Sequence, residues 1–397
     1  MNMKTYKKVE GYTLKSLHNI DKNVFNSIKD KSEMLDSEVE FLCGLIRDNK
    51  PKKIVEVGVS AGGTTAVILH CLSELDYQCE MYSVDLSEKY YRDINKNSGY
   101  IAEDYKLATN YKGNHKLLLG KVLPEQLEQI GGDIDFIIID TVHSLPGEVI
   151  DFLAAFPYLS ENAVVVLHDT FLHYKCHARS SYATSILYQS VTADKYLNNQ
   201  SEYPNIAAFT INQDTEKYIL DVFNSLIITW SFVIDDDMFI KYRNLYAKYY
   251  GAEAVRLFEQ AFEAAKKFHS EEKDIRNSNA AEVKKALEYI IDKYKHENIL
   301  LYGAGEYGKS LLKFMSKFGV KVSGFVVSEG HATNKSYCGL PVYSINELTS
   351  EFSDCIIFKA ASSNIIDTTL KSLSYKSVVL PNNFLMSINS YIKSIDE

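Results

Sequence analysis

Residues 54–65 read IVEVGVSAGGTT, and this stretch decides the fold of the region around it. Its first part is apolar except for Glu56, which is typical of a strand buried in a parallel sheet. The glycines that follow, Gly58, Gly62 and Gly63, allow a sharp turn and a close approach of the backbone to another group. From about Thr64 onward the apolar spacing is that of a helix. The stretch predicts a strand, a glycine turn and a helix in succession.

Strands and helices alternate on both sides of this stretch. Further apolar runs predict strands over residues 79–86, 115–121, 135–140 and 163–169, and helical patterns occupy residues 36–49, 124–130 and 147–156. This alternation over residues 50–170 predicts an α/β, Rossmann-like doubly wound sheet that is mostly parallel. Beyond it, we expect a helix over residues 180–198, a strand over 205–211, and helices over 215–227 and 238–268.

The glycine turn indicates the kind of ligand. A helix that opens directly after such a turn presents free backbone N–H groups to the ligand. The glycine spacing differs from the G-x-G-x-x-G of dinucleotide sites, and an acid, Glu56, precedes the first glycine. An acid there repels a phosphate and attracts a cation, so we expect a nucleoside-like ligand with a positive charge. Asp85 ends the next strand, where it either accepts hydrogen bonds from a ribose or caps the strand end.

Four motifs in order resemble those of class I S-adenosylmethionine (SAM)-dependent methyltransferases. They are EVGVSAG (56–62), VD (84–85), IIDTVH (138–143) and VLHD (166–169). More narrowly, the sequence resembles the branch that includes the macrolide-sugar O-methyltransferases and the cephalosporin-hydroxylase-like proteins, over about residues 35–230. This resemblance implies a seven-stranded sheet. It also implies that Glu56 and Asp85 flank the amino acid and ribose of SAM, while Gly58, Ser60 and Gly62 line the cofactor.

Four polar residues follow two of the predicted strands. Asp140 and His143 come after one strand, and His168 and Asp169 end the next, so the sheet edge is expected to bring them together. We interpret His143 as the catalytic base and Asp140 as a second catalytic residue. Asp140, His168 and Asp169 form a candidate divalent cation site, for Mg²⁺ or another metal. The related families place an acid where His168 stands, and Mg²⁺ prefers oxygen ligands. The alternatives are carboxylates that cap the next segments and a histidine bonded to backbone.

The pattern restarts near the C-terminus. Gly303, Gly305 and Gly308 fit G-x-G-x-x-G between a predicted strand and a predicted helix. The segment resembles small Rossmann-like domains of sugar-modifying enzymes in surface-polysaccharide pathways, which implies a nucleotide or nucleotide-sugar site; a purely structural domain is the alternative. We therefore divide the chain into a methyltransferase domain (1–235), a helical connector (236–296) that contains a polar linker at 269–279, and a small Rossmann-like domain (297–397).

Composition narrows the class of protein. The 397 residues have a net charge of −9, which argues against nucleic acid or an anionic membrane as partner. No apolar run is long enough to span a membrane, and the six cysteines form no C-x-x-C pair, so we expect a cytoplasmic protein. The abundant tyrosines reflect composition bias or, for a few of them, carbohydrate stacking. A homo-oligomer is compatible with this composition.

The sequence thus predicts a SAM-dependent methyltransferase that O-methylates a sugar or a nucleotide-linked sugar in polysaccharide or glycoconjugate biosynthesis. One alternative is a nucleotide-sugar oxidoreductase or epimerase that uses the second glycine turn. Against it, Ser328 stands where the dinucleotide fingerprint has an acid. The other alternative is a non-catalytic module that binds SAM or a nucleotide.

Overall fold

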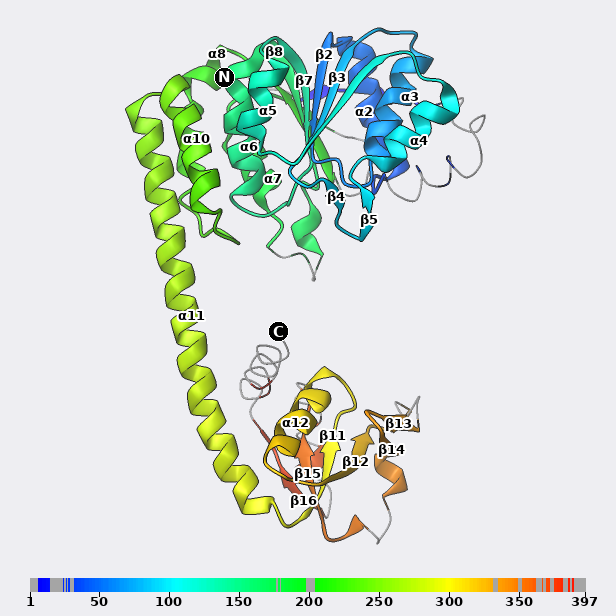
Figure 1. Cartoon of the computed structure of the whole chain (residues 1–397), viewed down its shortest axis with the longest axis vertical. Helices are drawn as coiled ribbons and strands as arrows, with labels where there is room; N and C mark the ends of the chain where they lie inside the picture. The colour runs from blue at the N-terminus through cyan, green and yellow to red at the C-terminus, as the bar shows by residue number, and fades with distance from the viewer. Residues whose placement is uncertain are drawn as a thin grey trace. The chain divides into compact units, whose positions relative to one another are not determined.

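The chain forms two compact units, Met1–His269 and Ser270–Glu397, in a computed structural model (Figure 1). The structure describes residues 6–14, 24, 26, 28, 32–175, 178, 180–197, 204–330, 335–348, 352–361, 366, 369–371, 375–380, 385 and 388. Side chains at 274–284, 286, 287, 290 and 291 are outside this description. None of the helices in the described part combines the length and the apolar composition that a membrane span needs.

An eight-stranded sheet forms the centre of the first unit, in the order β1-β9-β10-β8-β7-β2-β3-β6. The strands are β1 (Lys7–Lys8), β2 (Lys53–Val57), β3 (Glu80–Asp85), β6 (Asn114–Leu119), β7 (Ile134–Ile139), β8 (Leu159–His168), β9 (Asp194–Leu197) and β10 (Ile206–Thr210). Strands β6, β3, β2, β7 and β8 run parallel, and β10 lies antiparallel to β8. The doubly wound α/β fold is confirmed, with one strand more than the seven expected.

Both faces of this sheet are covered by helices (Figure 1). One face carries α2 (Asp36–Asn49), α3 (Gly63–Glu74) and α4 (Tyr100–Thr109); the other carries α5 (Leu123–Ile130), α6 (Gly147–Ala155), α7 (Ala183–Ser190) and α10 (Asp236–Tyr249). Alternate residues of the central strands supply two cores. In β7, Ile137 and Ile139 join the core under α6, whereas Phe136 and Ile138 join the core under α3. This burial on both faces explains the continuous apolar runs.

Three expectations for the segments after β8 need correction. Residues 180–198 do not form one helix, because α7 ends at Ser190 and β9 follows. Residues 238–268 are divided between α10 and α11 (Ala252–Tyr294) by Gly251, which has a φ of 81°. The polar run 269–279 continues as part of α11 instead of forming a non-helical linker. Short helices α8 (Gln213–Lys217) and α9 (Ile219–Ser225) occupy most of the helix expected over 215–227.

Tyrosines fasten α10 to α6. The hydroxyls of Tyr246 and Tyr250 donate to the backbone carbonyls of Ile150 and Leu153, at 2.9 Å and 2.6 Å. Tyr242, one turn earlier, donates to a side chain of α6 and is described with the site. Spaced four residues apart, the three side chains lie on one face of the helix. These tyrosines therefore serve packing between the two helices.

The second unit is a smaller α/β unit whose sheet has the order β13-β14-β12-β11-β15-β16. Its elements are β11 (Asn298–Tyr302), α12 (Glu306–Lys317), β12 (Val322–Val327), β13 (Ser336–Tyr337), β14 (Leu340–Ser344), β15 (Cys355–Lys359) and β16 (Lys376–Val378). All neighbouring strands run parallel except β13 and β14. The strand, glycine turn and helix predicted at its start are present as β11, residues 303–305 and α12.

Candidate active site

One pocket of about 600 Å³ opens at the carboxyl ends of β2, β3, β7 and β8. Its wall takes in the glycine turn after β2, the end of β3 and the loops that follow β6 and β7. The predicted site residues in the wall are Gly58, Ser60, Asp85, Asp140, His143, His168 and Asp169. The sheet therefore brings seven of the predicted residues of the first unit to one cavity, at the edge where ligands bind in open α/β sheets.

Close packing at positions 58 and 62 of the first turn leaves no room for a side chain, so glycine is required there. Gly58 has a φ of +93°, and a Cβ atom there would lie 1.9 Å from the carbonyl oxygen of Asp140. Gly62, with a φ of +89°, caps the start of α3, where a Cβ atom would lie 2.8 Å from Cα of Gly99. The turn is thus held between two neighbouring loops, and the N-terminus of α3 faces the pocket through Thr64.

Asp85 holds the glycine turn from the end of β3. Its Oδ2 accepts hydrogen bonds from the backbone N–H groups of Val59 and Ser60, at 2.9 Å and 3.0 Å. Its Oδ1 accepts from the N–H of Ser87 at 2.8 Å. The carboxylate also lines the pocket, where Oδ1, which accepts one of these bonds, keeps a second lone pair. The structure therefore shows a cap of the turn, and the ribose contact stays a prediction that this geometry permits.

Glu56 lies beneath the glycine turn. Its side chain is 1% exposed, and its Oε2 accepts hydrogen bonds from Thr65 and Ser83 at 2.7 Å and 2.6 Å. Burial raises its pKa to about 7, although the two hydroxyl donors act in the opposite direction. The expectation that this carboxylate faces the ligand is wrong in geometry, because alternation along β2 points it toward α3 and away from the pocket wall.

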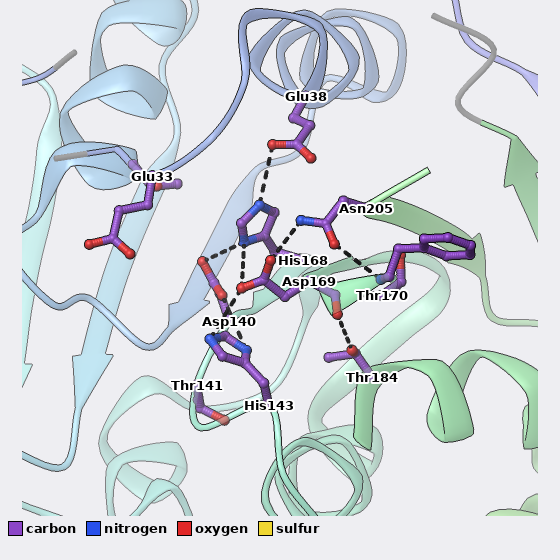
Figure 2. A network of polar contacts seen from close by, with 12 residues as sticks. Glu33, Glu38, Asp140, Thr141, His143, His168, Asp169, Thr170, Thr184 and Asn205 are labelled. Atoms are coloured by element: carbon purple, nitrogen blue, oxygen red, sulfur yellow. Dashed lines mark hydrogen bonds and ion pairs between the residues drawn. The ribbon is translucent and has the colours of Figure 1, made fainter. Parts of the chain in front are cut away.

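Asp140, His143 and Asp169 face one another across the pocket (Figure 2). Nε2 of His143 lies 3.3 Å from Oδ2 of Asp169, and Nδ1 lies 3.8 Å from Oδ1 of Asp140. One ligand atom from each of the three lies within 4.8 Å of the others. Burial raises the pKa of Asp140. The rings of His168 and His143 lower this pKa by a larger amount, so the net shift is downward. The site therefore offers an ionised carboxylate beside an imidazole.

His168 lies between two carboxylates and is 2% exposed. Its Nδ1 lies 3.2 Å from Oδ2 of Asp140, and its Nε2 lies 3.4 Å from Oε2 of Glu38 in α2 (Figure 2). Burial lowers the pKa of this ring, but the charges of Asp140, Glu38 and Asp169 raise it well above its ordinary value. Both ring nitrogens of His168 thus face carboxylates, Nδ1 toward Asp140 and Nε2 toward Glu38.

Asp169 is held by Asn205, directly before β10, and by Thr184 in α7. Its φ of 57° is left-handed, and Nδ2 of Asn205 donates to its Oδ1 at 2.6 Å. The side-chain oxygen of Asn205 accepts from the N–H of Phe171 at 3.1 Å, and Thr184 donates to the carbonyl of Asp169 at 3.0 Å. Figure 2 shows the contacts of Asn205 and Thr184 with Asp169. The second carboxylate of the site therefore has a fixed orientation.

Glu148, at the start of α6, holds the loop that carries His143. It accepts hydrogen bonds from the backbone N–H of His143 and from the hydroxyl of Thr141, the latter at 3.0 Å. The same oxygen lies 3.6 Å from Nδ1 of His143. The side chain is fully buried, and burial raises its pKa although His143 lowers it. His143 is therefore oriented through both its backbone and its ring.

Sequence reasoning missed Glu38, Glu148 and Asn205. Glu38 and Asn205 lie more than thirty positions from their partners, with no motif that connects them. Glu148 had a weak local signal, since an acid in the first turn of a predicted helix follows His143 by five positions. All three act on residues that the motifs had already indicated.

A divalent cation fits this site through a ligand set different from the one expected. Asp140, His143 and Asp169 converge closely enough for one ion, and among the described residues they are the group that does so. His168 belongs to the predicted set, but its nitrogens face Asp140 and Glu38. With one nitrogen and two carboxylates, the set differs from the oxygen ligands that Mg²⁺ prefers.

The second glycine turn has two packed glycines and one open glycine. Cβ atoms at Gly303 and Gly308 would lie 2.7 Å from the carbonyl oxygen of Ala360 and 2.1 Å from that of Gly303. At Gly305, which caps the start of α12, a Cβ atom would meet nothing within 4 Å. Ser328 is hydrogen-bonded to the hydroxyl of Tyr302 at 2.9 Å. Close packing thus requires glycine at positions 303 and 308, and the open side of the turn is at Gly305.

A family model described as a methyltransferase domain matches residues 55–170. Curated proteins gave no match. Among solved structures, a putative O-methyltransferase from Klebsiella pneumoniae is 14% identical, with a TM-score of 0.37, over 48% of this chain and 90% of that one. An O-methyltransferase from Bacillus cereus in complex with SAH is 16% identical, with a TM-score of 0.36, over 49% and 90%. TomG from Streptomyces achromogenes, in complex with SAM, is 14% identical, with a TM-score of 0.36, over 50% and 93%.

Proposed function

We propose that the SAM-dependent methyltransferase domain of this chain transfers the methyl group of SAM to a hydroxyl group of a sugar or a nucleotide-linked sugar. The observation that carries the proposal is the convergence of Asp140, His143 and Asp169 in the pocket that also contains the glycine turn. Cofactor and acceptor groups thus share one cavity. Methyl transfer requires this arrangement, because acceptor oxygen, methyl carbon and sulfonium must lie in line.

The cofactor's placement follows from charge and from the ends of the strands. The carboxylate of its methionine part suits the N-terminus of α3, where Ser60 and Thr64 line the pocket. A ribose hydroxyl suits the remaining lone pair on Oδ1 of Asp85 at the end of β3. The sulfonium then faces Asp140, whose negative charge attracts it. Glu56, buried under the turn, acts on the cofactor through the loop that it supports.

His143 is the base in this proposal. Its Nε2 accepts the proton of the acceptor hydroxyl, while the oxygen attacks the methyl carbon and the bond from that carbon to sulfur breaks. The products are the methyl ether, S-adenosylhomocysteine (SAH) and a protonated His143. Glu148 and Asp140, near Nδ1, stabilise the charge that forms on the ring. Asp169 accepts a hydrogen bond from a second, unreacting hydroxyl of the acceptor.

A divalent cation, if one binds, is held by Asp140, His143 and Asp169, and it supplies positive charge that lowers the pKa of an acceptor hydroxyl. The same nitrogen of His143 can act as the base or as a ligand of the ion, but it cannot do both at once. Addition of EDTA, followed by Mn²⁺ or Mg²⁺, separates them, because only the ligand role makes methyl transfer depend on the ion.

The sugar acceptor rests on the resemblance noted from the sequence and on the chemistry of the site. Two carboxylates and an imidazole around one cavity can accept several hydroxyl protons at once, which suits a polyhydroxyl acceptor. For the second unit, we propose a nucleotide or nucleotide-sugar site at Gly303, Gly305 and Gly308. The open backbone at Gly305, at the start of α12, supports it.

Calorimetry with SAM and SAH is the first test, on wild type and on Asp85→Ala. We expect micromolar binding that Asp85→Ala weakens tenfold or more, because the variant loses the ribose contact and also the backbone hydrogen bonds that hold the turn. Methyl transfer from labelled SAM to a panel of nucleotide sugars, free sugars and catechols then identifies the acceptor. Asp140→Asn is the matched control, since it should bind SAH and fail to transfer. A folded wild type that binds neither SAM nor SAH would refute the proposal.

A further inference from the structure

We infer that Asp151 recognises the adenine base of SAM by accepting a hydrogen bond from its exocyclic amine, and so selects a cofactor that carries adenine. The inference rests on the cofactor placement proposed above. Asp151 lies on α6, lines the pocket and is 9% exposed. It is distinct from the acceptor cluster of Asp140, His143 and Asp169, and the methyl transfer described above leaves it without a role.

The direction of the cofactor in the pocket leads to this position. SAM is an elongated molecule with methionine at one end, ribose in the middle and adenine at the other end. The sulfonium must face the cluster after β7 and β8, the methionine carboxylate suits the start of α3, and the ribose suits Asp85. The base then extends past Asp85 into the remaining part of the pocket, which α5, α6 and residues 232–242 enclose.

That part of the pocket has the chemistry of a slot for a base. The pocket lining on the face of the sheet that α6 covers includes Ile150, Phe232, Ile234 and Met238, and Asp151 of α6 lines the same pocket. A purine has two apolar faces and a polar edge, so it needs apolar walls and a few polar groups at one side. A sugar, with hydroxyls on most of its carbons, would leave several of them unpaired against such walls.

The carboxyl group of Asp151 has a fixed orientation, and part of its capacity to accept hydrogen bonds is free. Its Oδ1 accepts a hydrogen bond from the hydroxyl of Tyr242 at 2.5 Å. Its Oδ2 has the hydroxyl of Thr141 at 3.5 Å, which is the outer limit of a hydrogen bond. Tyr242 is itself 2% exposed in α10. One fixed oxygen thus keeps acceptor capacity in a pocket wall, where an amine N–H would satisfy it.

The test compares SAH with S-inosylhomocysteine, in which a carbonyl replaces the amine of the base. Calorimetry on wild type should give a preference for SAH of about tenfold or more, because the carbonyl leaves Asp151 facing another acceptor. Asp151→Asn keeps the shape and the bond from Tyr242 but presents an N–H₂ group. Its preference should fall to within about threefold or reverse.

Tyr242→Phe is the matched control, because it perturbs the same cluster and leaves the Asp151 carboxyl in place. It should keep the wild-type preference for SAH even if both affinities fall. A wild type that binds both ligands equally would overturn the inference, and so would Asp151→Asn with an unchanged preference or with a change only in the KM of the acceptor. Binding of neither ligand by wild type would instead overturn the proposed function and the inference together.

Discussion

Replacing Glu56 with glutamine should stabilise the first unit in a way that depends on pH. The wild-type carboxyl group is 1% exposed, and its pKa is raised from 4.5 to about 7 by burial. A shift of this size corresponds to about 3 kcal/mol of penalty on the ionised form in the folded state. Glutamine keeps an oxygen for the hydrogen bonds from Thr65 and Ser83 and cannot ionise.

The sign of the effect follows from where the proton is held. Below about pH 4.5 both states of the wild type are protonated, so Glu56→Gln gains nothing from removing the charge. Between 4.5 and about 7 the unfolded chain releases the proton while the folded protein retains it, so wild-type stability falls as pH rises. Above about 7 the full penalty is present, and the variant should lead by about 3 kcal/mol.

Urea denaturation of wild type and Glu56→Gln at pH 5, 6, 7 and 8 measures this difference in stability. The signal to monitor is the unfolding transition of the first unit. Thr65→Val is the control of opposite sign: it removes a hydrogen bond that favours the ionised form of Glu56, so it should be destabilising, and more so at pH 8 than at pH 5. A constant difference between Glu56→Gln and wild type across this range would refute the reasoning. So would a variant that is less stable at pH 8 than at pH 5, relative to wild type.

Three further predictions test other parts of the first unit. Gly58→Ala should unfold the glycine turn or abolish SAH binding in calorimetry, because its Cβ atom would lie 1.9 Å from the carbonyl oxygen of Asp140; a variant with normal binding would contradict this. Tyr246→Phe should lower the free energy of unfolding by about 1 kcal/mol in urea, since it removes a buried hydrogen bond; an unchanged midpoint would argue against the bond. Asn205→Ala should lower kcat about tenfold with SAH affinity intact, because Asp169 loses the amide that orients it; a loss confined to cofactor binding would exclude that role.

The fold could be predicted because its signals are local. Strands such as β7 are continuous apolar runs, and glycine at position 58 is required by a backbone conformation. The failures after β8 have a physical reason too. Residues 180–198 contain helix-compatible residues throughout, but those of β9 pair with β10, and that pairing is not visible in the segment itself. Pairing between distant segments overrides weak local preference.

The site divides in the same way. Asp140, His143 and Asp169 were predictable because they follow strands whose ends meet at one edge of the sheet. The orientation of Glu56 was also predictable. Alternation along β2 places its side chain on the side of Ile54, away from Val55 and Val57. Glu38 reaches His168 from another helix, so only the packing of α2 on the sheet reveals that contact.

The tyrosines that join α10 to α6 have a consequence for anyone who works with fragments of this protein. The family match ends at residue 170, yet Tyr242, Tyr246 and Tyr250 bond to the helix that carries Asp151. A fragment cut at the end of the match would expose that helix and open one side of the pocket. The smallest piece for expression, crystallisation or transfer to another scaffold therefore extends to about His269, where the first unit ends.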